Sequence, residues 1–266
     1  MTGKPICPYF TPRPLESGSE KMPEDLVAKK KVAYYAGCFA DYYYPEVGKA
    51  TVRVLRKNGI EVVVPDQVCC GLPMMAKGNT KKAYKNMDYN IKVLSQSVSD
   101  GYAVIITCTS CGLFIKRDYP LHLKSEETKL VSENAFHITE YLLRLYEGGT
   151  LNTDFRSIPQ TVFYHMPCHL KVQETSDVTV RMLELIPGTS IKYVSKTCCG
   201  MAGSYGYDRV NYERSRQIAD KLYSEIKGNP TERIVDDCGG CKLQIEAGTG
   251  RKVDHPIILI QEAYNL

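Results

Sequence analysis

The sequence predicts an α/β protein of two pseudo-symmetric, Rossmann-like repeats with parallel strands. Short apolar, β-branched runs alternate with longer amphipathic segments of helical period, the pattern of parallel-sheet proteins. Ten of the eleven cysteines also recur in two matched sets, each reading Cys, then Cys-Cys-Gly, then Cys-X-X-Cys. Corresponding cysteines of the two sets are 129 or 130 residues apart at every position. The chain is therefore a duplicated unit.

In the first copy we expect strands at residues 32–35, 60–64 and 104–107, each a short apolar run. A helix should begin near Pro45, carry Val47, Thr51, Val54 and Leu55 on one face, and end at Asn58-Gly59. A longer helix should begin near Asn79. Its apolar residues stand at helical spacing: Ala83, Met87, Ile91, Leu94 and Val98.

The second copy should follow the same course, with strands at residues 162–164, 191–194 and 234–235. A helix with Val178, Met182, Leu185 and Ile186 on its apolar face should end at Pro187-Gly188. The next helix should carry Val210, Ile218, Leu222 and Ile226 and stop at Gly228. Each copy should close with an amphipathic helix introduced by histidine, at residues 137–146 and 255–264.

Composition places the chain among globular proteins, with 43% hydrophobic and 24% charged residues. Residues 1–28 hold five prolines and Cys7 and are expected to form a flexible or docking tail; repeats at 29–150 and 151–266 follow.

The net charge of +4 does not indicate nucleic-acid binding. The sequence shows neither a membrane span nor a signal peptide, so we expect a cytoplasmic protein. Any association with a membrane should come through partner subunits. In the reducing cytoplasm, clustered cysteines are expected to bind metal rather than to form disulfides.

Every cysteine group follows the carboxyl end of a predicted strand. The first set is Cys38, Cys69, Cys70, Cys108 and Cys111, and the second set is Cys168, Cys198, Cys199, Cys238 and Cys241. The carboxyl ends of parallel strands meet at one edge of a sheet, where ligands collect. Five thiols spread over more than seventy residues can therefore meet at one point in each copy.

Thiolates select zinc, copper(I) or iron–sulfur clusters. Two Cys-X-X-Cys pairs alone would favour zinc, and a zinc-stabilised scaffold without redox activity is one hypothesis. Five thiols exceed the four of a tetrahedral zinc or a cubane cluster, however, and adjacent cysteines point their side chains apart, which suits a polynuclear cluster. The sequence therefore favours iron–sulfur over zinc.

The two cysteine sets resemble the CCG domain of iron–sulfur oxidoreductases, and two complete sets resemble the B subunit of heterodisulfide reductase. That resemblance implies two non-cubane [4Fe-4S] clusters, one held by each cysteine set. It also implies an oxidoreductase active only within a complex. Such a protein reduces or forms a disulfide by one-electron steps, with electrons from a ferredoxin-like iron–sulfur subunit and in some complexes a flavoprotein.

A second resemblance rests on residues 164–169, 198–206, 241–246 and 255–257. These look like the C-terminal half of the C subunit of anaerobic glycerol-3-phosphate dehydrogenase, with lactate- and glycolate-oxidising relatives. It implies electron transfer between a flavin dehydrogenase and quinone. The absence of a ferredoxin module and the complete first cysteine set depart from that pattern and favour a stand-alone cluster subunit.

Histidines near the second cysteine set are candidate catalytic groups. His165 and His169 flank Cys168. A neutral imidazole can donate a hydrogen bond to a cluster sulfur or relay a proton to a leaving thiolate. A structural histidine that satisfies local backbone groups is an equally good interpretation for each. His137 and His255 occupy matching positions in the two copies, which favours the structural interpretation for both.

Overall fold

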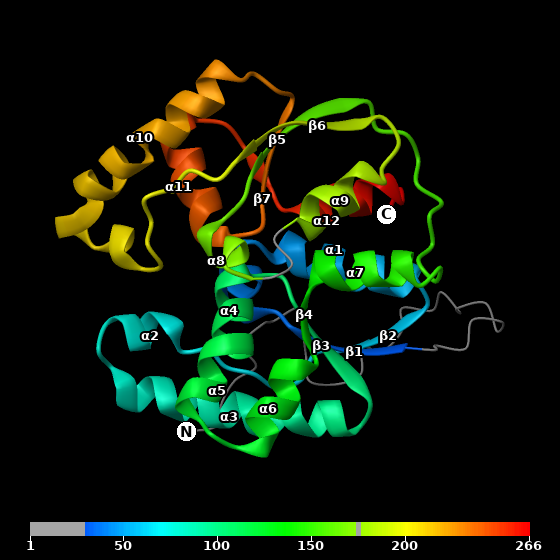
Figure 1. Ribbon diagram of the computed structural model, residues 1–266, viewed down its shortest axis with the longest axis vertical. Helices are drawn as coiled ribbons and strands as arrows, with labels where there is room; N and C mark the ends of the chain where they lie inside the picture. Colours follow the sequence, from blue (N-terminus) through cyan, green and yellow to red (C-terminus); the bar gives the residue numbers. More distant parts are fainter. Residues whose placement is uncertain (1–29, 174–176) are drawn as a thin grey trace. The chain divides into compact units, whose positions relative to one another are not determined.

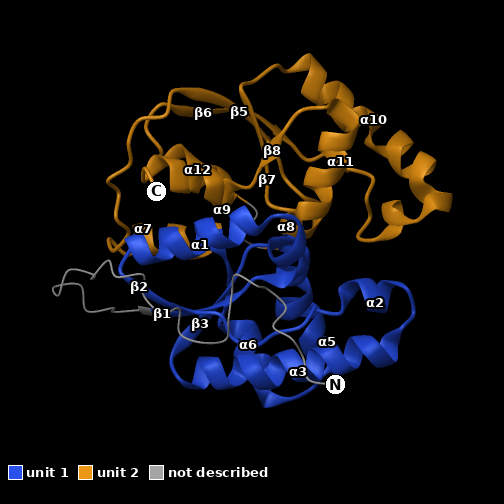
Figure 2. Cartoon of the chain, turned by 180° about the vertical axis from the view of Figure 1, so that it is seen from behind, with its two compact units in different colours: residues 1–138 blue, residues 139–266 orange. Residues whose placement is uncertain are grey.

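The computed structural model describes residues 30–173 and 177–266. The predicted tail at 1–28, with Cys7, lies outside the described residues. The chain divides into two compact units, Met1–Ile138 and Thr139–Leu266 (Figure 2). Each unit holds one four-stranded parallel sheet, and the two sheets share one strand order. The predicted α/β fold of two pseudo-symmetric repeats is confirmed.

The first sheet has the strand order β2-β1-β3-β4, with every neighbouring pair parallel. Its strands are β1 (Lys30–Tyr35), β2 (Ile60–Val63), β3 (Tyr102–Ile106) and β4 (Ala135–His137). Helix α1 (Pro45–Lys57) links β1 to β2, and α3 (Thr80–Ser99) links β2 to β3. The two helices cover opposite faces of the sheet (Figure 1). The strand order therefore reverses between β1 and β3, the switch point where α/β sheets bind ligands.

The second sheet has the equivalent order β6-β5-β7-β8, again all parallel. Its strands are β5 (Gln160–His165), β6 (Thr189–Ser195), β7 (Arg233–Asp236) and β8 (Val253–Asp254). Helices α9 (Val178–Glu184) and α12 (Pro256–Ala263) contact each other on one side of this sheet. Helices α10 (Tyr212–Gly228) and α11 (Gly239–Thr249) pack together on the other side.

The local signals in the sequence work as predicted in the first copy. Pro45 begins α1, and Asn79 caps α3 by accepting a hydrogen bond from the backbone N–H of Lys82 at 3.3 Å. Strands β4 and β8 were not predicted, because segments of three and two residues are too short for a periodic pattern.

The predicted apolar face of the second long helix is wrong at two positions. Val210 precedes α10 and is 90% exposed, and Ile218 is 44% exposed. The buried positions at this end of the helix belong instead to Ser215 and Ala219. Small residues are required there because α10 lies against Gly200, where a Cβ would stand 2.0 Å from the Ser215 carbonyl oxygen.

Helix α7 (Ile138–Glu147) ends the first repeat in sequence, yet from Thr139 onward it belongs to the second compact unit. Its Thr139 hydroxyl lies 2.9 Å from that of Thr179 in α9, and Arg181 of α9 forms an ion pair with Glu147. Among the helices of the described residues, none combines the length and the apolar character needed to span a bilayer.

The contact between α10 and α11 gives a test of this packing. The Tyr223 ring covers Gly248, where a Cβ would lie 2.0 Å from Cζ, and the Tyr223 hydroxyl donates to the Gln244 carbonyl at 3.0 Å. We expect Gly248→Ala to lower the free energy of unfolding by about 1–3 kcal/mol through overpacking, despite the better helix propensity of alanine. Gly228→Ala is the matched control. No atom lies within 4 Å of the added methyl, so it should be neutral or stabilising in urea unfolding. Equal stabilities for the two variants would contradict this packing.

Candidate metal centres

The cysteines of each unit lie at the carboxyl edge of its sheet, and most stand where a helix begins. In the first unit Cys38 precedes the five-residue π-helix η1 (Phe39–Tyr43), and Cys108 caps α4 (Thr109–Leu113). In the second unit Cys168 begins α8 (Cys168–Lys171) and Cys238 caps α11. Backbone N–H groups at such positions have no helical acceptor and are free to donate to sulfur.

The structure brings the five sulfurs of the first set together. Cys111 donates to the sulfur of Cys70 at an Sγ–Sγ distance of 3.4 Å. Cys69 accepts hydrogen bonds from both Cys38 and Cys70, and Cys108 accepts one from Cys111. The five side chains thus form one continuous chain of contacts. Cys70, Cys108 and Cys111 are buried, while Cys38 and Cys69 are half-buried.

The second set also has three buried cysteines in contact with one another, but its other two cysteines are more exposed than their counterparts in the first set. Cys241 donates to the sulfur of Cys199 at 3.0 Å and also contacts Cys238, and all three are buried. Cys168 and Cys198 are exposed. The sulfur of Cys168 lies within electrostatic reach of Cys198, Cys199 and Cys238. In both units the second cysteine of the adjacent pair is buried, whereas the first is half-buried (Cys69) or exposed (Cys198).

Hydrogen bonds within the first set lower the pKa of some thiols and raise the pKa of others. Hydrogen bonds from Cys38 and Cys70 lower the pKa of Cys69 to about 3, and one from Cys111 lowers the pKa of Cys108 to about 7. The pKa of Cys38 is raised, mainly because its thiol donates a hydrogen bond to Cys69 and secondly because the side chain is largely buried. Only some of the sulfurs in a set can therefore ionise together unless positive charge is supplied between them.

Backbone groups around the sulfurs also favour bound thiolate. The N–H of Gly200 donates to Cys198 Sγ at 3.3 Å, and the N–H of Gly71 donates to Cys69. Both glycines have positive φ, +96° for Gly71 and +79° for Gly200. A Cβ on Gly71 would lie 3.2 Å from the carbonyl oxygen of Ala83 in α3, the counterpart of the contact between Gly200 and Ser215. The glycine of each Cys-Cys-Gly therefore seats the cysteine pair on the helix that follows.

The residues fit an iron–sulfur cluster. Five soft donors converge in each unit, and in the first unit backbone N–H groups donate to the sulfurs of Cys69, Cys70 and Cys108. The Thr109 hydroxyl, next to Cys108, is fully buried and has no hydrogen-bond partner among residues 30–173 and 177–266. A cluster sulfur at this edge would give that hydroxyl an acceptor.

The two units differ behind the cysteines. In the first unit the Tyr35 hydroxyl donates to the carbonyl of Val68, just before the cysteine pair, at 2.7 Å. In the second unit His165 Nε2 makes the equivalent contact with the carbonyl of Thr197 at 2.8 Å. His165 Nδ1 bonds to the carboxyl of Asp236, which stands where the first copy has Ile106.

The pair of His165 and Asp236 was only half predicted, because the sequence pointed to the histidine alone; both residues are 1% exposed. Asp236 also accepts from the backbone N–H of Cys238 at 2.5 Å. Burial raises the pKa of Asp236 to about 6. Burial also opposes protonation of His165, but the charge and hydrogen bond of Asp236, together with Cys199 and the Thr197 carbonyl, outweigh burial and raise the pKa of His165. A carbonyl can only accept, so Nε2 carries a proton and the pair shares one more. The position of Asp236 two residues before Cys238 was the signal that could have revealed it.

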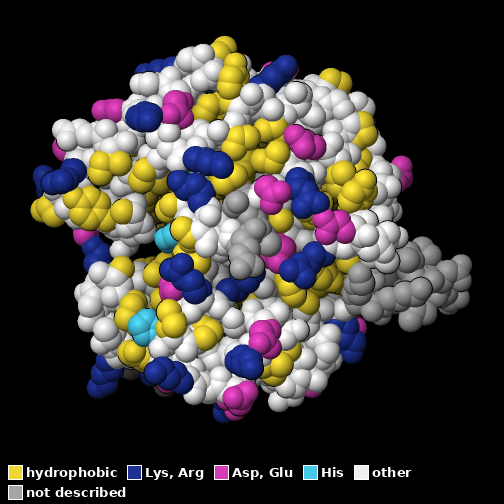
Figure 3. Space-filling view, in the orientation of Figure 1, with side chains coloured by type: hydrophobic (Ala, Val, Ile, Leu, Met, Phe, Trp, Pro, Cys, Tyr) yellow, Lys and Arg dark blue, Asp and Glu magenta, His cyan; other side chains and the backbone are white. Residues whose placement is uncertain are grey.

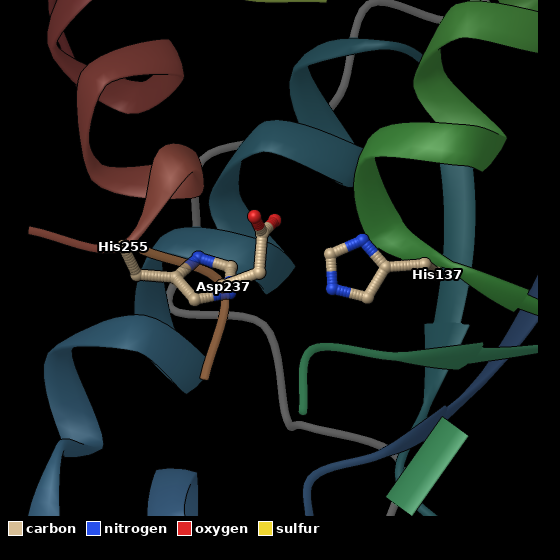
Figure 4. Close-up of side chains that lie close together, drawn as sticks. All are labelled: His137, Asp237 and His255. Atoms are coloured by element: carbon tan, nitrogen blue, oxygen red, sulfur yellow. The ribbon is translucent and has the colours of Figure 1, made fainter. Parts of the chain in front are cut away.

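The other three histidines considered in the sequence analysis lie in different surroundings from His165. His169, in α8, is half-buried beside Cys168. His255 caps α12 by accepting from the N–H of Ile257 at 3.1 Å, and in the same unit it lies near Asp237 (Figure 4). Figure 4 also draws His137 of the first unit, whose Nε2 lies 3.4 Å from the Thr107 carbonyl oxygen.

Comparison with known proteins adds a family match. The cysteine-rich domain model named CCG matches residues 32–116 and 162–246, one span within each predicted repeat. The C subunit of anaerobic glycerol-3-phosphate dehydrogenase from Escherichia coli (strain K12) is 34% identical over 238 residues, 88% of this chain and 59% of that protein. The resemblance inferred from the cysteine sets is confirmed.

Two further relatives have different lengths. The B subunit of fumarate reductase (CoM/CoB) from Methanothermobacter marburgensis is 32% identical over 221 residues, 81% of this chain and 42% of that protein. Lactate utilization protein A of Geobacillus thermodenitrificans is 27% identical over 236 residues, 85% of this chain and 94% of that protein. The chain thus spans only 59% of the glycerol-3-phosphate dehydrogenase relative and 42% of the fumarate reductase relative.

Replacing the buried pair tests its structural role. His165→Tyr copies the tyrosine of the first unit but leaves the Asp236 carboxyl without its ring partner, so we expect the free energy of unfolding to fall by about 3–5 kcal/mol. Adding Asp236→Ile installs both first-copy residues and removes the unpaired carboxyl. The double variant should therefore recover at least half of that loss in urea unfolding. A double variant less stable than the single one would contradict this coupling.

Proposed function

Because this chain belongs to the CCG cysteine-rich domain family, with one domain in each repeat, we propose that it is an iron–sulfur redox subunit of a larger oxidoreductase. The observation that carries the proposal is the convergence of five cysteine sulfurs in each unit. One four-iron cluster would be held by each set. The ligands would be Cys38, Cys69, Cys70, Cys108 and Cys111 in the first unit and Cys168, Cys198, Cys199, Cys238 and Cys241 in the second.

When bound, a four-iron cluster supplies one-electron transfer. The chain's own residues hold it and set its surroundings. Buried Cys70, Cys111, Cys199 and Cys241 keep water from the inner side of each site, and backbone N–H groups donate to the sulfurs, which favours the more negative, reduced state. The outward-facing Cys69 and Cys198 mark the side from which a redox partner approaches.

The partners that the relatives support are members of dehydrogenase complexes. The relatives' names include anaerobic glycerol-3-phosphate dehydrogenase, lactate utilization and glycolate oxidase proteins. We infer that this chain exchanges electrons with a ferredoxin-like iron–sulfur subunit and a flavoprotein subunit, with quinone as an acceptor of the complex. Any association with a membrane would then come through those partners.

Disulfide chemistry is a second candidate function, which the exposed sulfurs of the second unit favour. Cys168 and Cys198 leave that site open to a small thiol, and a fumarate reductase (CoM/CoB) protein is among the relatives. In this function His169, half-buried beside Cys168, is placed to deliver a proton to a leaving thiolate. His165 is buried, with both ring nitrogens engaged, and its part would be to hold the loops that carry Cys198 and Cys238.

Metal analysis tests the proposed cofactors. Anaerobically purified protein should be brown and carry about eight iron and about eight sulfide per chain, for two four-iron clusters. Cys70→Ser and Cys199→Ser should each remove about half of the iron, because each disrupts one site. Stoichiometric zinc in a colourless preparation would contradict the proposal, and so would loss of all iron from either variant while the fold is retained by circular dichroism.

Turnover of the reconstituted complex separates the two candidate functions. If quinone reduction is the function, a quinone analogue should be reduced and a disulfide left intact, and His169→Gln should leave that rate within about two-fold. If disulfide chemistry is the function, His169→Gln should slow thiol release by about 10²-fold or more, the usual range for general acid catalysis. Thiol release and quinone bleaching can be followed in the same preparation.

A further inference from the structure

A basic surface borders the first cysteine set, and its lysines are not among the proposed ligands. Between Asp66 and Asp88 the sequence contains no acidic residue and four lysines, all exposed: Lys77, Lys81, Lys82 and Lys85. They stand at the end of α2 (Leu72–Ala76) and on the first two turns of α3. Figure 3 shows Lys and Arg side chains over this region at the lower left of the view.

An apolar element lies beside these lysines. Helix α2 consists of Leu72, Pro73, Met74, Met75 and Ala76; Pro73 and Ala76 are exposed, and the other three are half-buried, Leu72 and Met75 by packing against the core of the first unit. Cys69 precedes this helix with its half-buried sulfur facing outward. An apolar, methionine-containing centre with a charged rim is the composition of a protein–protein interface. The surface defined by residues 72–85 therefore leads to a sulfur of the first site.

The lysines oppose the local preference of the helix. The positive end of the helix dipole lies at its N-terminus, where acidic residues stabilise and cations destabilise by about 0.3–1 kcal/mol each. Lys81 and Lys82 occupy the first turn of α3, which has no acidic residue, and Lys81 and Lys85 form a like-charge i,i+4 pair. Cations concentrated where the helix disfavours them indicate a function outside folding.

The second unit lacks this surface. The glycines that follow the two cysteine pairs contact Ala83 of α3 and Ser215 of α10, each the fourth residue of its helix, which aligns the two helices. By that alignment Lys81, Lys82 and Lys85 correspond to Glu213, Arg214 and Gln217. The segment after Gly200 forms turns and the short 3-10 helices η3 (Tyr205–Tyr207) and η4 (Arg209–Asn211) in place of an apolar helix, and its charged side chains are of both signs. A surface with lysines and no acidic residue is thus specific to the first copy.

We propose that the surface of residues 72–85 docks an acidic electron-carrier protein, so that electrons enter or leave this chain at the first cysteine set. This inference rests on the proposed redox function. In each encounter one electron passes from the reduced carrier to the metal centre of the first set; the carrier is oxidised by one electron, the centre is reduced by one, and no bond forms or breaks. Opposite charges across the interface steer the encounter.

Charge reversal tests the docking surface. The variant is Lys81→Glu/Lys85→Glu. Lys82 is left unchanged because its positive charge lowers the pKa of Cys69. A reduced, acidic [2Fe–2S] ferredoxin is the probe, and stopped-flow bleaching measures the bimolecular rate constant. At about 0.01 M salt, where charges act over about 30 Å, the rate constant should fall at least ten-fold. At about 1 M salt, charges interact over only about 3 Å, so the rate constants of the variant and the wild type should differ by less than about two-fold.

Arg53→Glu/Lys57→Glu is the matched control, with the same charge change. Both residues are exposed on the later part of α1, which leads to the amino end of β2 and away from the cysteines. This control should lower the rate constant less than about three-fold. The test variant should keep its melting temperature, since glutamate suits the first turn of α3. It should also be reduced to the same extent by reduced methyl viologen, a small cation that needs no lysine.

The outcomes separate this inference from the proposed function. An unchanged ferredoxin rate at low salt in a viologen-reducible variant would overturn the docking surface alone, and so would an equal loss in the control variant. Wild-type protein that carries no iron, or whose iron viologen cannot reduce, would overturn the proposed function and this inference with it.

Discussion

The arrangement of this protein follows from the need to hold five cysteine sulfurs close together in each unit. Thiolates repel one another, and the hydrogen bonds within each set let only some of them ionise together. A group of like donors so close together needs a rigid support and a positive charge at its centre. The parallel sheet supplies the support, because the loops after its strands start from one edge with fixed spacing. Metal would supply the charge.

The glycine of each Cys-Cys-Gly ties that edge to a helix. Gly71 and Gly200 adopt positive φ and lie against the fourth residue of α3 and α10, so that a side chain on Gly200 would collide with the helix backbone. This contact accounts for the small residues Ala83 and Ser215 at the facing positions. It also explains why one sulfur of each adjacent pair is buried and the other faces outward. One packing contact thus sets the orientation of two ligands.

The two copies share a frame but differ in chemistry. In each copy a ring side chain forms a hydrogen bond with the backbone carbonyl that precedes the cysteine pair. In the first copy this side chain is the neutral Tyr35. In the second copy it is His165, which also bonds to the carboxyl of Asp236. The first copy adds lysines around an apolar helix, and the second leaves Cys168 and Cys198 exposed. Duplication preserved the cysteine set while the surroundings diverged. Under the functions proposed above, such divergence would let one site face a protein partner and the other a small molecule.

Sequence patterns alone were enough to establish the fold class and the duplication, and they also predicted the cysteine sets proposed here as ligands. The six predicted strands are long enough for an apolar run to show, and the cysteine spacing places every ligand after a strand end. Strands β4 and β8 were beyond such reasoning, because pairing with β3 and β7, rather than local pattern, makes them strands.

The folded chain was needed to show which cysteines are exposed, that Asp236 joins His165, and that Ser215 replaces Ile218 in the buried contact of α10. The same holds for the helix α2, whose five apolar residues composition alone would assign to a core, although only Leu72 and Met75 pack against it and none of the five is fully buried. Each of these features depends on contacts between segments distant in sequence. Periodicity and spacing describe what a segment prefers, whereas burial and pairing depend on what the folded chain places beside it.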